Sequence, residues 1–120
     1  MRNKAESTKA IKLCRNSCVI CNWNKTDRDG VPLVEGAHIK PFEADKTKDK
    51  FDNIIALCPN HHTMFDHHLF YIDPKTKHTV FWDKNDEFHD IDLSERIKYI
   101  KIEYLAYNQY IYEQSNLIMI

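Results

Sequence analysis

Two pairs of closely spaced metal-binding residues constrain this chain more than any other feature. Cys18 and Cys21 form a C-x2-C pair, and Cys58 and His61 form a C-x2-H pair, with 36 residues between the two pairs. Each pair can place two soft ligands on one side of a tight turn, and two pairs complete the tetrahedron that zinc prefers. Four protein ligands leave no open position. We therefore predict a structural Zn2+ that pins both ends of the intervening segment.

Other uses of the cysteines stay open from the sequence. Four cysteines could form two disulfides, but a chain without an export signal is expected in a reducing compartment, where closely spaced thiols more often hold metal. Cys18 and Cys58 could be ordinary buried thiols. Cys14 is expected to be one, although it could also replace one ligand of the set.

Length and hydropathy favour one domain that spans residues 1–120. The chain has 120 residues and 42% hydrophobic residues, enough for one modest core. It contains no run near the roughly 20 apolar residues of a membrane span, and its N-terminal segment lacks the apolar centre of a signal peptide. We therefore expect a cytoplasmic protein without a membrane partner.

Charge is distributed unevenly along the chain. The net charge of −1 argues against strong DNA binding through bulk electrostatics alone. Residues 1–28, however, carry seven Lys/Arg and two acids, a net of +5, whereas residues 83–120 carry four and eight, a net of −4. One face could meet phosphate while the other faces solvent or a partner. A basic N-terminal helix is about as often simply a solvated face.

The residue pattern predicts an α+β order of elements. Pro59 suits the first turn of a helix, and Ser94 after Asp92 precedes an apolar stripe that indicates a final, core-packed helix. The predicted elements are a helix at 4–16, a loop at 25–32, a strand at 33–39, a polar loop at 40–52, a strand at 53–57, a helix at 60–67, a hairpin of 69–73 with 78–82, and a helix at 93–113.

A second group of chemically active residues lies between and just after the zinc pairs. His62 and Asp66 are four residues apart on a predicted helix, so they project from one face and could share a metal. His38 ends the first predicted strand, where an imidazole without a metal can accept a proton from water. Asn53 begins the second predicted strand.

Three segments carry a resemblance to a known family. They read Glu35-Gly-Ala-His38-Ile-Lys-Pro41, then Asp52-Asn53-Ile-Ile-Ala-Leu57-Cys58-Pro-Asn-His61-His62, then Met64-Phe65-Asp66. This arrangement resembles the HNH endonuclease superfamily, in the subgroup of predicted restriction endonucleases with an AHI-x-P first motif. The resemblance covers residues 18 to about 73. It implies a small zinc-braced ββα-metal domain with an N-terminal helix, a following β-hairpin and a C-terminal helix.

The resemblance also implies an activity and the roles of individual residues. The family hydrolyses DNA phosphodiester bonds with one divalent cation, Mg2+ or Mn2+, and leaves 5′-phosphate and 3′-hydroxyl ends. His38 corresponds to the general base, and Asn53 to the residue that braces the loop and orients it. His62 corresponds to a ligand of the catalytic metal, and Asp66 to a second ligand. The zinc would take no part in the chemistry.

The sequence departs from the family at one position and leaves one assignment open. Many members carry a metal-binding Asp or His just before the general base, where this chain has Ala37. Glu35, on the same strand face by alternation, is a candidate replacement. His61 and His62 could exchange roles, since adjacent helical residues point about 100° apart. We assign His61 to zinc because it completes the C-x2-H pair.

Nucleic-acid contacts and specificity are less defined. Lys40, Arg15 and Lys12 are candidates for flanking phosphates. The chain shows no base-reading element, so specificity would come from another domain, another subunit or a partner, and a homodimer is compatible with this reading. The remaining histidines, His67, His68, His78 and His89, lack comparable spacing and are expected at the surface.

Two classes of function are compatible with these patterns. The first is a DNA endonuclease of the restriction type, or the nuclease module of a larger enzyme. The second is a non-catalytic zinc-structured module that binds nucleic acid or protein, with His38 and Asp66 as structural polar residues. A binding module has no need of a His38 that is free of metal and faces a second metal site. Such a histidine therefore discriminates the endonuclease from the binding module.

Overall fold

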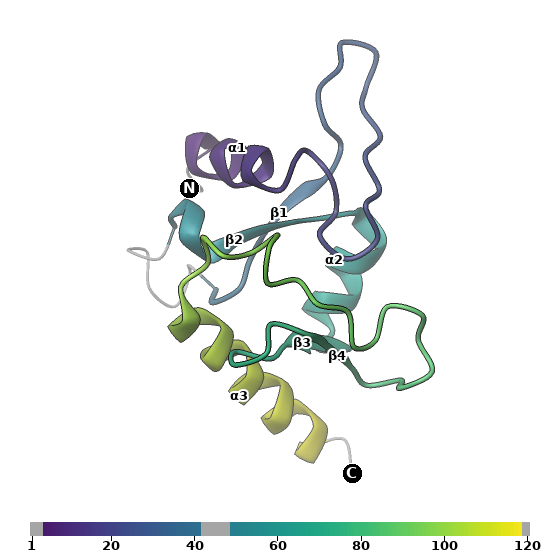
Figure 1. Ribbon diagram of the computed structural model, residues 1–120, viewed down its shortest axis with the longest axis vertical. Helices are drawn as coiled ribbons and strands as arrows, with labels where there is room; N and C mark the ends of the chain where they lie inside the picture. The colour runs from purple at the N-terminus through teal and green to yellow at the C-terminus, as the bar shows by residue number, and fades with distance from the viewer. Residues whose placement is uncertain (1–3, 42–48, 119–120) are drawn as a thin grey trace.

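The computed structural model describes residues 4–41 and 49–118. Its elements follow the predicted order (Figure 1). They are α1 (Lys4–Leu13), β1 (Glu35–His38), the short 3-10 helix η2 (Phe51–Asn53), β2 (Ile54–Leu57), α2 (Pro59–Asp66), β3 (Phe70–Ile72), β4 (Thr79–Phe81) and α3 (Ile102–Ile118). The predicted α+β class, both hairpins and the flanking helices are confirmed. Residues 42–48 of the predicted polar loop lie outside the described residues.

The first hairpin joins segments that the long loop separates in sequence. Strands β1 and β2 pair antiparallel, with Glu35 opposite Leu57 and His38 opposite Ile54. All four residues of β2 are buried, so both faces of this hairpin need a cover. Helix α1 covers one face: a Cβ added to Gly36 would lie 3.1 Å from the Ser7 hydroxyl oxygen, so glycine permits this close approach. Glu35 on the opposite face reaches His62 of α2.

Helix α2 begins and ends through local features of the sequence. Pro59 occupies the first turn, where a missing backbone donor costs nothing, and the Cys58 sulfur accepts from the backbone amide of His61. The helix ends at Asp66, and His68 adopts a left-handed conformation with φ of 58°. The short helix therefore places its histidines at defined positions relative to β1 and β2.

The second hairpin and α3 form the other end of the molecule (Figure 1). Strands β3 and β4 pair with Phe70 opposite Phe81, and their rings stack with centroids 4.7 Å apart. Helix α3 packs against β3, where Tyr112 contacts Tyr71 with ring centroids 4.7 Å apart. One cluster of buried side chains runs from Cys14, just after α1, through β2 to Phe70 and Phe81. No helix of the described ranges is long and apolar enough to cross a bilayer.

The predicted start of the final helix is wrong. Helix α3 begins at Ile102, and residues 93–101 form turns, although Ile97 and Ile100 are buried as the apolar stripe indicated. Long-range hydrogen bonds hold this segment: the Arg96 guanidinium donates to the carbonyl oxygen of Cys14 at 2.9 Å, and the Tyr99 hydroxyl donates to that of Ile54 at 2.7 Å. Helix α1 also ends at Leu13, earlier than predicted, because Arg15 and Asn16 adopt positive φ.

Candidate metal centre and active site

The two predicted zinc pairs meet in one cluster. The ligand atoms of Cys18, Cys21, Cys58 and His61 all lie within 4.8 Å of one another. Zinc–sulfur bonds of about 2.3 Å in a tetrahedron place two sulfurs about 3.8 Å apart. The Sγ atoms of Cys21 and Cys58 are 3.8 Å apart, and Cys58 Sγ lies 3.3 Å from His61 Nδ1. The donor set and its spacing therefore fit a structural zinc site.

Burial shifts the pKa of two residues of this cluster, Cys21 and His61. Burial, with a smaller contribution from the neighbouring Cys18 thiol, raises the pKa of Cys21 to about 12. Burial also lowers the pKa of His61, which favours the neutral imidazole that binds metals. The His61 ring packs edge-on against Phe88, with centroids 5.2 Å apart, so its surroundings are apolar. A divalent cation would favour the thiolate form of the cysteines, and its binding would therefore release protons.

Local turns hold both halves of the cluster. Between Cys18 and Cys21 the chain makes a tight turn in which the Asn22 amide donates to the Cys18 carbonyl oxygen at 2.9 Å. The amide of Val19 donates to the carbonyl oxygen of Ala56 in β2 at 3.0 Å, which joins the turn to the hairpin. The cluster contains His61 and not His62, as the C-x2-H pair predicted.

Cys14 lies outside the metal cluster. Its sulfur is 3.1 Å from the Tyr99 hydroxyl, and burial raises the pKa of its thiol. It is therefore a buried thiol that packs against the turns before α3, and it does not substitute for a zinc ligand in this arrangement.

A second group of polar side chains lies where α2 faces β1. Nδ1 of His62 lies 2.7 Å from a carboxylate oxygen of Glu35, and Nε2 lies 3.6 Å from Oδ2 of Asp66. The i,i+4 spacing that the sequence predicted thus places His62 and Asp66 side by side. The Glu35 carboxylate thus contacts the ring nitrogen of His62 that does not face Asp66.

His38 has a carboxylate partner that sequence reasoning missed. Its Nε2 lies 2.9 Å from Oδ1 of Asp49, and the two side chains are 5% and 10% exposed. Asp49 belongs to the predicted polar loop, and no spacing rule distinguishes it from the other acids there. The many charged residues of this loop indicated that an acid could pair with His38. Which acid does so depends on the tertiary structure and not on the sequence spacing.

Asn53 braces the chain two residues after His38. Its Oδ1 accepts from the Lys40 amide at 2.9 Å, and its Nδ2 donates to the Lys40 carbonyl oxygen at 2.7 Å. The Asn53 side chain is fully buried, and its backbone carbonyl also accepts from the amide of Ile39 at 2.9 Å. This two-point contact is the geometry expected of the bracing role that the resemblance implies.

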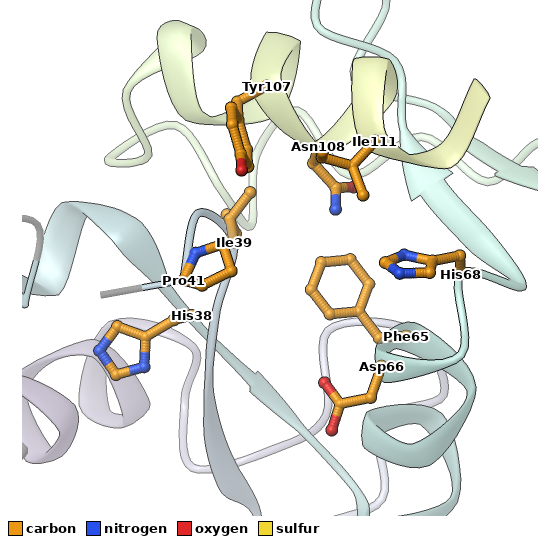
Figure 2. Close-up of a pocket in the computed structure, with 9 residues that line it drawn as sticks. All are labelled: His38, Ile39, Pro41, Phe65, Asp66, His68, Tyr107, Asn108 and Ile111. Atoms are coloured by element: carbon orange, nitrogen blue, oxygen red, sulfur yellow. The ribbon is translucent and has the colours of Figure 1, made fainter. Parts of the chain in front are cut away.

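A cavity is lined by both His38 and Asp66 (Figure 2). It encloses about 390 Å³ between the end of β1, the end of α2 and one face of α3. His38 and Asp66 both line it, although the His38 ring points away from Asp66 in Figure 2. His62 is not among its lining residues.

The three predicted phosphate-binding residues do not converge. The Lys40 ammonium lies 5.0 Å from the ring centroid of Tyr107, one of the cavity residues. Lys12 and Arg15 are exposed on α1 and the turn after it, on elements that do not line this cavity. Lys40 is thus the member of the set that is next to the candidate active site.

Known proteins resemble this chain in sequence and in fold. Residues 18–73 match a family model described as HNH endonuclease. A solved structure described as a modification dependent TagI restriction endonuclease has a TM-score of 0.69 and 21% sequence identity. That alignment covers 91% of this chain and 38% of the other, so this chain spans well under half of that protein's length. No curated protein matches the chain.

Proposed function

We propose that this chain is a metal-dependent endonuclease that hydrolyses DNA phosphodiester bonds, because residues 18–73 match the family model described as HNH endonuclease. The observation that carries the proposal is the separation of two sets of metal-binding or proton-accepting residues. One set is the four-residue Cys3His cluster, whereas His62 and Asp66 form a two-residue set whose side chains are 20% and 67% exposed. Structural metal sites are closed, and catalytic sites keep open positions.

The proposed chemistry needs a base on water and a cation beside the reacting phosphate. A divalent cation on His62 and Asp66 would stabilise the charge that develops on the phosphate and the leaving oxygen. Glu35 orients His62 by accepting the Nδ1 proton, which leaves the Nε2 lone pair directed toward Asp66. In this proposal Glu35 is a positioning residue, and water supplies the ligand that Ala37 does not.

His38 is the proposed general base. The Asp49 carboxylate, 2.9 Å from Nε2, stabilises the imidazolium that forms when the ring accepts a proton from water. Asn53 holds the Lys40 backbone and thereby limits the position of the strand end that carries His38. Lys40 is a candidate contact for a neighbouring phosphate because its ammonium lies at the cavity residue Tyr107.

The length of the solved structure that this chain resembles supports a modular role. Because the chain spans 38% of the restriction enzyme that shares its fold, we propose that it acts as a nuclease module with one domain over residues 1–120. Sequence specificity would come from an additional domain or subunit, and the compartment proposed is the cytoplasm. The structural cluster would hold Zn2+ and the catalytic pair Mg2+ or Mn2+.

One observation favours the alternative of a non-catalytic zinc module. The His38 side chain is 5% exposed and bonded to Asp49, as expected for a structural polar pair. The discriminating experiment is plasmid cleavage during a titration of divalent metals, with wild type beside His38→Ala. The His78→Ala variant is a matched control, because His78 pairs with Asp90 at 2.8 Å outside the cavity.

Loss of the general base should reduce cleavage by roughly 10²–10⁴-fold while zinc content, fold and DNA affinity persist. The His78→Ala control should cleave at the wild-type rate. If His38→Ala cleaves as fast as wild type, the general-base assignment is wrong. If wild type cleaves neither DNA nor RNA with any divalent metal, the binding-module alternative is favoured.

A further inference from the structure

The cavity beside the proposed catalytic residues has mostly apolar walls and a polar end. Ile39, Phe65 and Ile111 supply apolar surface, and the aromatic ring of Tyr107 stands on the α3 side (Figure 2). Its volume of about 390 Å³ is within the range of roughly 300–1,000 Å³ found for small-molecule sites. The volume and lining thus suit a small, partly apolar group.

The polar end carries hydrogen-bonding atoms that the described part of the protein does not satisfy. Asn108 is 7% exposed, and its Oδ1 is buried without a hydrogen-bond partner among the described residues. The buried Nδ1 of His68 also lacks a partner in the described ranges. Figure 2 shows the Asn108 amide pointing from α3 into the cavity, on the side of Phe65 and His68. Buried polar atoms without partners are rare and costly, which indicates a ligand or solvent that satisfies them.

The charges of the described lining residues disfavour a phosphate inside the cavity. Asp66 contributes a carboxylate, and no Lys or Arg of the described residues lines the cavity. The nearest cation described at a lining residue is Lys40, 5.0 Å from the Tyr107 ring centroid. An anion would therefore sit at the edge, near Lys40, and an uncharged group would enter the cavity.

We propose that this cavity receives one nucleobase of the substrate, adjacent to the phosphate that is cleaved. The proposal rests on the proposed nuclease function and extends it. A base presents donors and acceptors along its edge, which the amide of Asn108 and the imidazole of His68 can pair with. Its face can stack on an aromatic side chain such as Tyr107, and the cation of Lys40 can contact the attached phosphate.

A base inside this cavity cannot remain stacked and paired in a duplex. It must come from a single strand, a bulge or a mismatch, or be rotated out of the helix, and unpaired bases have the lowest cost of extrusion. The enzyme should therefore prefer DNA with an unpaired nucleotide at the cleavage position over fully paired DNA of the same sequence.

The test uses labelled duplexes that differ at one position: fully paired, with a one-nucleotide bulge, or with an abasic residue in the bulge. Wild type should cleave the bulged duplex about tenfold faster than the other two, the gain expected from buried hydrogen bonds to one base. Asn108→Leu, which keeps the branching of the side chain but removes its polar atoms, should reduce cleavage of the bulged duplex about tenfold and leave paired DNA within about twofold.

Two further variants make the result specific. Gln109→Leu removes the neighbouring amide, which lies 3.5 Å from the Tyr71 hydroxyl and does not line the cavity, so it should retain the preference for bulged DNA. Ile111→Phe reduces the cavity from another wall, and it should abolish the preference even if Asn108→Leu fails to fold. Zinc content and circular dichroism establish that each variant is folded.

Binding is measured separately by the fluorescence of 2-aminopurine placed in the bulge. Equal cleavage of paired and bulged DNA by wild type and Asn108→Leu would overturn the base-binding proposal while the nuclease function stands. No cleavage of any DNA, combined with a fluorescence change that Asn108→Leu abolishes and Gln109→Leu retains, would support the base site and overturn the nuclease function. Absence of both signals would overturn both.

Discussion

Replacing Cys58 with serine removes one ligand from the predicted zinc centre and weakens the metal cross-link between two distant segments of the chain. Cys58 and Cys21 are 37 positions apart, and their sulfurs are 3.8 Å from each other. By loop-closure arithmetic, a cross-link over this length removes about 13 cal/mol/K of chain entropy from the unfolded state, or about 4 kcal/mol at room temperature. A domain of this size has a total unfolding free energy of only about 5–15 kcal/mol. We therefore expect Cys58→Ser to lose its zinc and most of its stability.

The assay combines metal analysis with thermal unfolding. Wild type should keep about one zinc per chain after a mild chelator wash, because a closed four-ligand site releases metal slowly. Cys58→Ser should lose that zinc and either unfold or melt more than about 10 °C lower. Cys14→Ser is the matched control: Cys14 is as deeply buried but outside the cluster, so the variant should keep its zinc and lose about 1 kcal/mol.

A Cys58→Ser protein that retains one zinc per chain and melts within about 2 °C of wild type would show that the four residues do not hold a structural metal. Loss of zinc from Cys14→Ser to the same extent as from Cys58→Ser would instead show that the ligand set was assigned incorrectly.

Three more predictions concern the second metal pair and the β3–β4 turn. Asp66→Ala should weaken Mg2+ or Mn2+ activation, with partial recovery at high ion concentration and unchanged zinc; a wild-type metal titration would remove Asp66 from the site. Glu35→Ala should lower metal affinity or cleavage about 10–100-fold by freeing the imidazole it orients, and an unchanged rate would argue against that role. The backbone amides of Thr76 and Lys75 hold the pKa of Asp73 below its usual 3.8, so its ionised form stabilises the turn and that stabilisation is lost as pH falls through the lowered value. Urea unfolding should therefore show Asp73→Asn less stable than wild type at pH 7, with the difference in unfolding free energy shrinking as the pH falls through the lowered pKa of Asp73; a difference that does not change with pH would contradict this.

Interactions between near neighbours in sequence were the predictable part of the site. The C-x2-C and C-x2-H spacings predicted the cluster because each pair needs only one turn to converge. His62 and Asp66 lie side by side because four residues nearly complete a helical turn. Partners from distant segments were harder to predict. The pairing of Asp49 with His38 was missed. Glu35 was expected as a candidate metal ligand, but its contact with Nδ1 of His62 was not predicted.

The boundary of the last helix illustrates the same division. The apolar stripe correctly indicated that Ile97 and Ile100 are buried, since periodicity reports which side chains leave water. It did not reveal that the backbone from 93 to 101 forms turns, because long-range hydrogen bonds of Arg96 and Tyr99 decide that conformation. Local propensity is a weak determinant where several tertiary contacts compete with it.

The members of the Cys3His cluster, the order of elements and the HNH-type pattern could be predicted from sequence, because they depend on residue type and on separations of a few positions. The tertiary structure was needed to show that Asp49 pairs with His38, that Glu35 contacts Nδ1 of His62, and that α3 lies over a cavity lined by His38 and Asp66. Those contacts join residues from 11 to 27 positions apart, or from different helices, and their geometry follows from how β1, α2 and α3 pack. His68, expected at the surface, became a wall of that cavity for the same reason: a left-handed residue after α2 directs its ring toward α3.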